Sequence, residues 1–154
     1  MKWTILSLVA VGAVLAIVQG LGLFAEQTSE EIRIPYENSV AVARGQEIYA
    51  NACAACHGQK LEGQQNWNER RPDGRLPAPP HNEKGHTWHH ADRQLFEITK
   101  YGTAAFAPQG YQTDMRGYED VLTDNEILDV LAYIKAQWPA SIQKRHDALT
   151  LGSN

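Results

Sequence analysis

The stretch NACAACHGQ at residues 51–59 holds the chain's only two cysteines, and a histidine follows the second one directly. A C-x-x-C pair serves one of four chemistries: a redox disulfide, half of a zinc site, part of an iron–sulfur site, or attachment of haem c. Each chemistry needs different residues elsewhere in the chain. The rest of the sequence therefore decides which of the four it supports, and with it the fold.

Two of the four are disfavoured by what the chain lacks. An iron–sulfur cluster needs about four thiolates, or two thiolates with a matching pair of histidines. The chain has two cysteines and no matching paired histidine motif. A thioredoxin-type pair follows a strand in a βαβ pattern, whereas the residues before Cys53 have a helical pattern. A zinc site needs about four ligands. It stays open because four histidines could complete it: His81, His86, His89 and His90.

The fourth chemistry fits the motif itself, which reads C-x-x-C-H over residues 53–57. Two thioether bonds to a haem require two cysteines at a fixed separation, and the next residue can then direct its imidazole at the iron. We therefore expect one covalent haem c, bound through Cys53 and Cys56 with His57 as an axial ligand.

The second axial ligand could be a methionine, a second histidine, or absent. The chain has two methionines, and Met115 lies in the polar loop GYQTDMRGYEDVLTDNEI ahead of a strong helix start. A thioether ligand favours Fe(II) and raises the reduction potential relative to a second histidine. The competing interpretation of Met115, a gap-filling core side chain, suits this loop poorly. We expect Met115 to ligate, with a histidine of the 86–90 cluster as its rival.

The N-terminal run from Trp3 to Ala25 contains no charged residue. As a helix these residues would span roughly 35 Å, which is enough to cross a hydrocarbon core of about 30 Å. Lys2 precedes the run, which favours a cytoplasmic N-terminus and an exported remainder. We expect an uncleaved transmembrane anchor at 1–25, the alternative being a cleaved signal peptide. Both remove the cysteines from the reducing cytosol.

Two further stretches carry a family resemblance: SVAVARGQEIYANACAACHG and LTDNEILDVLAYIKAQWP. Over residues 39–138 the chain resembles a bacterial, membrane-anchored monohaem class I cytochrome c. The resemblance implies that the first and last helices cross, with Gly45 admitting Tyr133 at close range. The chain departs from the family where Arg116 stands after the methionine, a position that is often proline.

The helix pattern agrees with an all-α fold. Thr123 and Glu126 form a T-x-x-E capping box before a helix that Pro139 ends, and apolar residues recur along it at 3–4 spacing. A first helix begins at about Ser39, and a middle helix is expected over 90–101. The expected domains are an anchor at 1–25, a linker at 26–38, a class I cytochrome c haem domain at 39–138 and a tail at 139–154.

The long loop between Gly58 and Thr87 would pack on the haem edge. In the family a backbone carbonyl from a proline region orients the histidine ligand, and here Pro77 is favoured over Pro79. The haem propionates need donors, and the candidates are Trp67, Arg75 and Trp88. The competing interpretation is that the loop's arginines are simply solvated. A separate metal site at His86, His89 and His90 is disfavoured because no nearby carboxylate or cysteine completes it.

The net charge of −4 gives no sign of a nucleic-acid partner. An iron with both axial positions filled leaves no place for a small-molecule substrate, so we expect an electron carrier rather than an enzyme. The expected location is the bacterial inner membrane, with residues 3–25 in the bilayer and the haem domain in the periplasm. The resemblance implies a quinol-oxidising complex as donor and a terminal oxidase, reductase or photosynthetic reaction centre as acceptor.

Two alternatives remain: a dedicated haem subunit of a larger oxidoreductase complex, and a five-coordinate haem acting as a gas sensor or peroxidase. Six acidic residues also surround and follow Met115, and they would favour basic partners if they rim the haem edge. These residues are Asp114, Glu119, Asp120, Asp124, Glu126 and Asp129.

Overall fold

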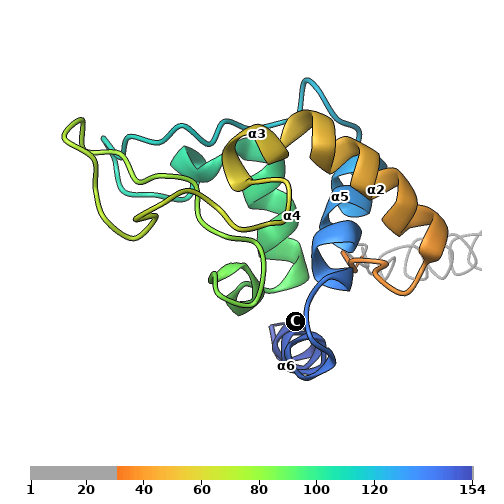
Figure 1. The fold of residues 1–154 in the computed structure, drawn as a ribbon. Coiled ribbons are helices and arrows are strands. Elements are labelled where there is room, and N and C mark those ends of the chain that lie inside the picture. The colour runs from red at the N-terminus through yellow and green to blue at the C-terminus, as the bar shows by residue number, and fades with distance from the viewer. Residues whose placement is uncertain (1–30, 154) are drawn as a thin grey trace, which may run out of the picture. The chain divides into compact units, whose positions relative to one another are not determined.

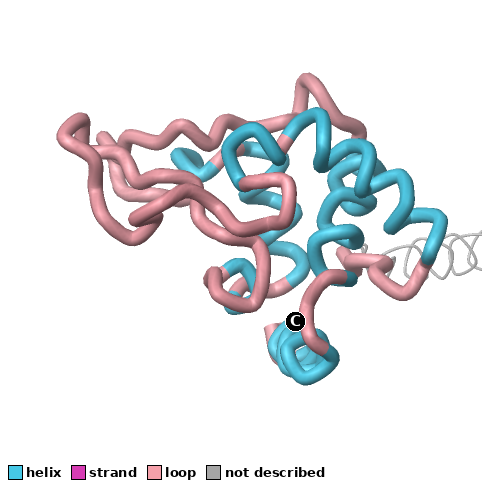
Figure 2. Tube along the Cα trace, in the orientation of Figure 1, coloured by secondary structure: helices cyan, strands magenta, loops and turns pink. Residues whose placement is uncertain are grey.

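A computed structural model describes residues 31–153 of the chain, and the helices there are joined by long loops (Figures 1 and 2). The only β pairing in this part is an isolated bridge between Gly102 and Arg116. The predicted all-α architecture is therefore confirmed for these residues. The helices are α2 (Ser39–Ala52), α3 (Ala54–His57), η1 (Thr87–His89), α4 (Asp92–Tyr101), η2 (Thr103–Ala105), α5 (Asp124–Ala136) and α6 (Ala140–Leu151).

The transmembrane anchor predicted at 1–25 lies outside the described residues. Among the helices that are described, none has the length and apolar character needed to cross a bilayer.

Helices α2 and α5 cross at close range (Figure 1). A Cβ atom on Gly45 would collide with the backbone carbonyl of Asp129 and lie 3.0 Å from the Cβ of Tyr133. The rings of Tyr49 and Tyr133 also meet, with centroids 5.4 Å apart. The predicted roles of Gly45 and Tyr133 at the crossing are therefore confirmed.

The helix starts follow from local capping. The Asn38 side chain accepts hydrogen bonds from the N–H groups of Val40 and Ala41, which fixes the start of α2. Thr123 and Glu126 form the predicted capping box of α5. The middle helix begins at Asp92, two residues later than expected, because His90 and Ala91 have extended backbone.

The apolar face predicted for α5 is the centre of the core. Ile127 and Ala132 are fully buried, and Tyr49 of α2 and Phe96 of α4 are also buried in this cluster. The residues predicted at 3–4 spacing are all buried: Ile127, Val130, Leu131, Ile134 and Trp138.

Residues 32–38, expected to be the end of a flexible linker, are part of the folded unit. Ile34 is only 5% exposed, and its N–H donates to Asp92 Oδ2 at 2.9 Å. Tyr36 donates its hydroxyl to Asp147 Oδ2 at 2.8 Å. The packed part of the chain therefore begins at about Ile32, and a linker can occupy only residues before it.

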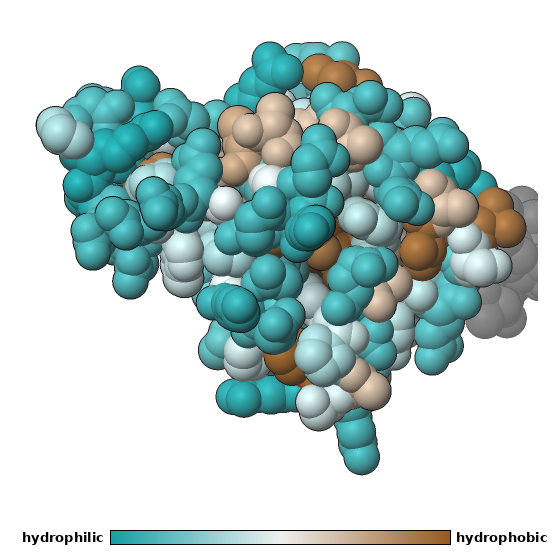
Figure 3. Space-filling view, viewed as in Figure 1, coloured by the Kyte–Doolittle hydropathy of each residue, from teal (hydrophilic) through white to brown (hydrophobic). Residues whose placement is uncertain are grey.

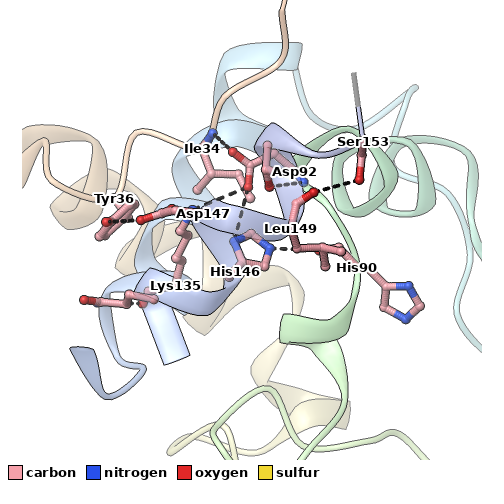
Figure 4. Close-up of polar contacts among 11 residues, drawn as sticks. Ile34, Tyr36, His90, Asp92, Lys135, His146, Asp147, Leu149 and Ser153 are labelled. Atoms are coloured by element: carbon pink, nitrogen blue, oxygen red, sulfur yellow. Dashed lines mark hydrogen bonds and ion pairs between the residues drawn. The ribbon is translucent and has the colours of Figure 1, made fainter. Parts of the chain in front are cut away.

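The C-terminal segment, whose structure the sequence left open, forms α6 and packs through a buried polar network (Figure 4). Lys135 of α5 is 1% exposed, and its Nζ lies 2.7 Å from Asp147 and 3.5 Å from Asp92. His146 of α6 is fully buried and donates from Nε2 to the carbonyl of His90 at 2.8 Å. Burial lowers the pKa of His146, which keeps the ring neutral for this bond. The network joins 32–36, α4, α5 and α6.

We expect Lys135→Met to destabilise the protein by about 3 kcal/mol, because it leaves the buried Asp92 carboxylate without its cation. The matched control is Lys100→Met, which breaks a pair with the exposed Asp124 and should destabilise the protein much less. Equilibrium urea unfolding of both variants measures the difference. Equal losses would contradict a special role for the buried pair.

Candidate functional site

The C-x-x-C-H motif forms a single helical turn directly after α2. Cys53 ends α2 and also begins α3, so the chain enters the motif without a loop. The N–H groups of Cys56 and His57 both donate to the carbonyl of Cys53, at 3.1 and 2.9 Å. The two thiols and the imidazole therefore project from one rigid turn.

The environment of the Cys53 thiol is unsuited to redox exchange. Both cysteines are free, Cys53 half-buried and Cys56 exposed. Burial, and then the neighbouring Cys56, raise the pKa of Cys53 to about 11. A catalytic redox pair needs a lowered thiol pKa, so this environment disfavours the thioredoxin-type alternative.

His57 is held in one orientation and one tautomer. The side chain is buried, and its Nδ1 lies 2.8 Å from the carbonyl oxygen of Pro79, which can only accept. Nδ1 therefore carries the proton and Nε2 keeps a free lone pair. Burial lowers the pKa of His57, which favours the neutral ring a metal ligand requires. The acceptor is the carbonyl of Pro79 and not that of the favoured Pro77. Gln64 holds Ala78 through two hydrogen bonds of 2.9 Å, which fixes the loop directly before the Pro79 carbonyl.

Two tyrosine hydroxyls fix the ends of the motif turn. Tyr49 donates to the carbonyl of Gly58 at 2.9 Å, just after His57. Tyr118 donates to the carbonyl of Ala52 at 2.8 Å, just before Cys53. The second bond connects the Met115 loop to the motif, although the two are about sixty residues apart in sequence.

The Met115 loop runs against the C-terminal end of α4. Met115 is half-buried, and its N–H donates to Thr113 Oγ1 at 3.0 Å. Arg116 forms the bridge with Gly102, and the N–H of Tyr118 donates to the carbonyl of Lys100 at 2.9 Å. The backbone after Met115 is therefore fixed by α4.

His81 has a role that the sequence did not indicate. Its ring stacks on His57 with centroids 3.9 Å apart and an interplanar angle of 23°. Its Nδ1 lies 2.8 Å from Thr87 Oγ1. Burial and the neighbouring His57 and His86 hold the pKa of His81 well below its usual range, so a neutral ring packs against His57.

The histidines at 86–90 have ring contacts rather than a shared metal geometry. His86 stacks on Trp67 with centroids 5.6 Å apart, and His89 packs on Trp88 at 3.7 Å. Within residues 31–153, no group of three or more His, Cys, Asp or Glu side chains could hold a metal ion. The described residues therefore supply no zinc site.

Comparison with known proteins shows which family this chain matches. The family model for cytochrome c matches residues 42–138, which is more than half of the chain. The chain belongs to the cytochrome c family. Membership implies a covalently bound haem c and haem-based electron transfer.

One solved structure is similar to this cytochrome, namely cytochrome CL from the marine methylotrophic bacterium Methylophaga aminisulfidivorans MPT. The identity is 23% and the TM-score 0.48, over 71% of this chain and 62% of that one. This cytochrome therefore spans less than two thirds of that protein's length. A search of curated proteins gave no match.

The described residues fit a haem at this site. Three buried side-chain N–H groups lack a hydrogen-bond partner: Nε1 of Trp88 and Nε of Arg71 and Arg75. An unpartnered buried donor is costly, and propionate oxygens would satisfy it. Trp88 and Arg75 are predicted donors, and Arg71 is an additional candidate. Trp67, the third predicted donor, has no such orphaned atom and stacks on His86.

The acidic cluster near Met115 is largely neutralised within the protein. Asp129 is buried and paired with Arg44 at 2.7 Å, and Lys100 pairs with Asp124 at 2.7 Å. Asp114 pairs with two arginines, and Glu126 serves the capping box. The expectation of an acidic docking face is therefore weakened, because three of the six carboxylates are paired; Glu119, Asp120 and Glu126 have no ion pair among residues 31–153.

We expect Trp88→Phe to lower the midpoint potential of the holoprotein by roughly a few tens of millivolts. Removing an N–H donor leaves the propionate charge less compensated, which favours Fe(III). Trp67→Phe is the matched control, since its indole N–H is not a buried orphan. Redox titration of both variants is the measurement, and equal shifts would contradict the assignment of Trp88 as a donor.

Proposed function

We propose that this cytochrome is a one-electron carrier with a single haem c bound through Cys53 and Cys56, with His57 and Met115 as axial ligands. The observation that carries the proposal is His57, a buried neutral imidazole at the end of the C-x-x-C-H turn, oriented by Pro79. The haem supplies the Fe(III)/Fe(II) couple.

The chain's own residues set the conditions for electron transfer. The thiols hold the cofactor at a turn braced by Tyr49 and Tyr118. His57 presents Nε2 with its tautomer fixed. Met115 supplies a soft thioether that favours the reduced state. With both axial positions filled, no substrate reaches the metal, and the protein acts as a carrier rather than as an enzyme.

We expect the purified holoprotein to show a weak far-red sulfur-to-iron band when oxidised, and no reaction with carbon monoxide when reduced. Met115→Ala should abolish the band and open the iron to carbon monoxide. Optical spectra of both proteins test this. A band that survives Met115→Ala would refute Met115 as ligand. Carbon monoxide binding by the unmodified protein would favour a gas sensor or peroxidase.

The proposed location is the bacterial inner membrane, with residues 3–25 spanning the bilayer and the haem domain in the periplasm. The support is the uncharged length of that run and the single Lys2 before it, which favours an exported remainder. The proposed partners are redox proteins nearby: a quinol-oxidising complex as donor, and a terminal oxidase, reductase or reaction centre as acceptor. A tether that ends before Ile32 would keep the haem close to such complexes.

We expect the full-length protein to stay with membranes through a high-salt and alkaline wash. A form in which residues 1–25 are replaced by a cleavable signal peptide should instead appear in the soluble periplasmic fraction. Haem staining of the two fractions, with intact mass of the native protein, provides the measurement. A native protein that is soluble and shortened at its N-terminus would show cleavage instead of anchoring.

A further inference from the structure

Two projecting loops meet at a single carboxylate, that of Asp114. The loops at residues 58–86 and 106–118 extend together from the helices (Figure 1), and this end of the molecule is hydrophilic (Figure 3). Arg71 Nη2 contacts Asp114 Oδ2, and Arg75 Nη1 lies 3.3 Å from Asp114 Oδ1. We call these three residues the Asp114 clamp. It joins segments 43 residues apart in sequence.

The sequence R-P-D-G-R explains why both arginines face one acceptor. The Gly74 N–H donates to the Arg71 carbonyl, and the Arg71 N–H donates to the Arg75 carbonyl, both at 2.9 Å. Gly74 has a φ of +83°, which glycine adopts at no steric cost. This tight turn brings residues 71 and 75 opposite each other, so their guanidinium groups reach the same carboxylate.

Met115 follows Asp114 directly, and the chain around it is held by two kinds of contact. After Met115, the bridge of Arg116 with Gly102 and the Tyr118 N–H bond to Lys100 are made by backbone atoms. Before Met115, the contacts are made by side chains: the charge pairing at Asp114, and the Arg70 guanidinium 5.6 Å from the centroid of the Tyr111 ring. Substitution of Asp114 removes the charge pairing and leaves the backbone contacts in place.

The same arginines also carry donors that would suit the proposed cofactor. The Nε atoms of Arg71 and Arg75 are buried without a hydrogen-bond partner, although Arg71 Nε lies 3.6 Å from Asp73 Oδ1. Each guanidinium therefore has Nη directed at Asp114 and Nε free for a propionate. The two arginines would therefore connect the Met115 loop to the propionates of the cofactor.

From this arrangement we propose that the Asp114 clamp is the positioning device that keeps Met115 on the iron. This inference depends on the proposed function, because it takes Met115 as the ligand. The three side chains are 37%, 40% and 51% exposed, so each ion pair is partly screened by solvent. Losing the clamp should therefore raise the fraction of protein with Met115 off the iron about fivefold rather than a hundredfold.

Imidazole binding to the oxidised full-length holoprotein measures that fraction. Imidazole binds only when Met115 has left, so its apparent affinity rises in proportion to the open population. We expect Asp114→Asn to tighten imidazole binding about fivefold. Asp120→Asn is the matched control, since it removes the same charge from an exposed residue of the same region that has no ion pair among the described residues. It should have no effect.

A Met115→Ala background shows whether the clamp acts through the methionine. There the iron is already open, so Asp114→Asn should leave imidazole affinity unchanged. An equal effect of Asp114→Asn and Asp120→Asn, or an effect that persists in Met115→Ala, would overturn the clamp. If the unmodified protein binds imidazole as tightly as Met115→Ala does, Met115 is not the ligand, and the proposed function fails first.

Discussion

The close approach of α2 and α5 at Gly45 is the constraint on which the site depends. No side chain larger than hydrogen fits between the two backbones there, so the crossing has one geometry. Because α2 runs into the C-x-x-C-H turn without a loop, the crossing also determines where the thiols and His57 lie relative to the core. The helix contact at Gly45 therefore sets the position of the residues that would attach the cofactor.

The two charged clusters of this cytochrome differ in burial, and their expected contributions to stability differ accordingly. Lys135 and Asp92 are almost completely buried, so their pairing is costly to break and holds α6 and residues 32–36 against the core. Asp114 and its arginines are about half exposed and contribute little to global stability. Weak contacts of this kind can position a loop, which is the role proposed above for the Asp114 clamp.

The features that could be predicted from sequence depend on local contacts. The Thr123 cap, the apolar face of α5 and the Gly45 crossing follow from spacing within a few residues or from the resemblance. The acceptor for His57 could not be chosen between Pro77 and Pro79, because it depends on how a long loop returns to the motif. The same is true of His81, which reaches His57 across 24 positions in the chain.

The ion pairs show even more clearly that contacts between residues distant in sequence could not be predicted. Sequence places six acidic residues around and after Met115 and suggests a charged face, but a carboxylate's partner can lie anywhere in the chain. Arg44 reaches Asp129 across 85 residues, and Arg71 reaches Asp114 across 43. The R-P-D-G-R turn was a usable local signal, since it predicts two guanidinium groups side by side that need one shared anion. A pattern of charged residues is therefore informative about function only when the turns that bring those residues together are considered as well.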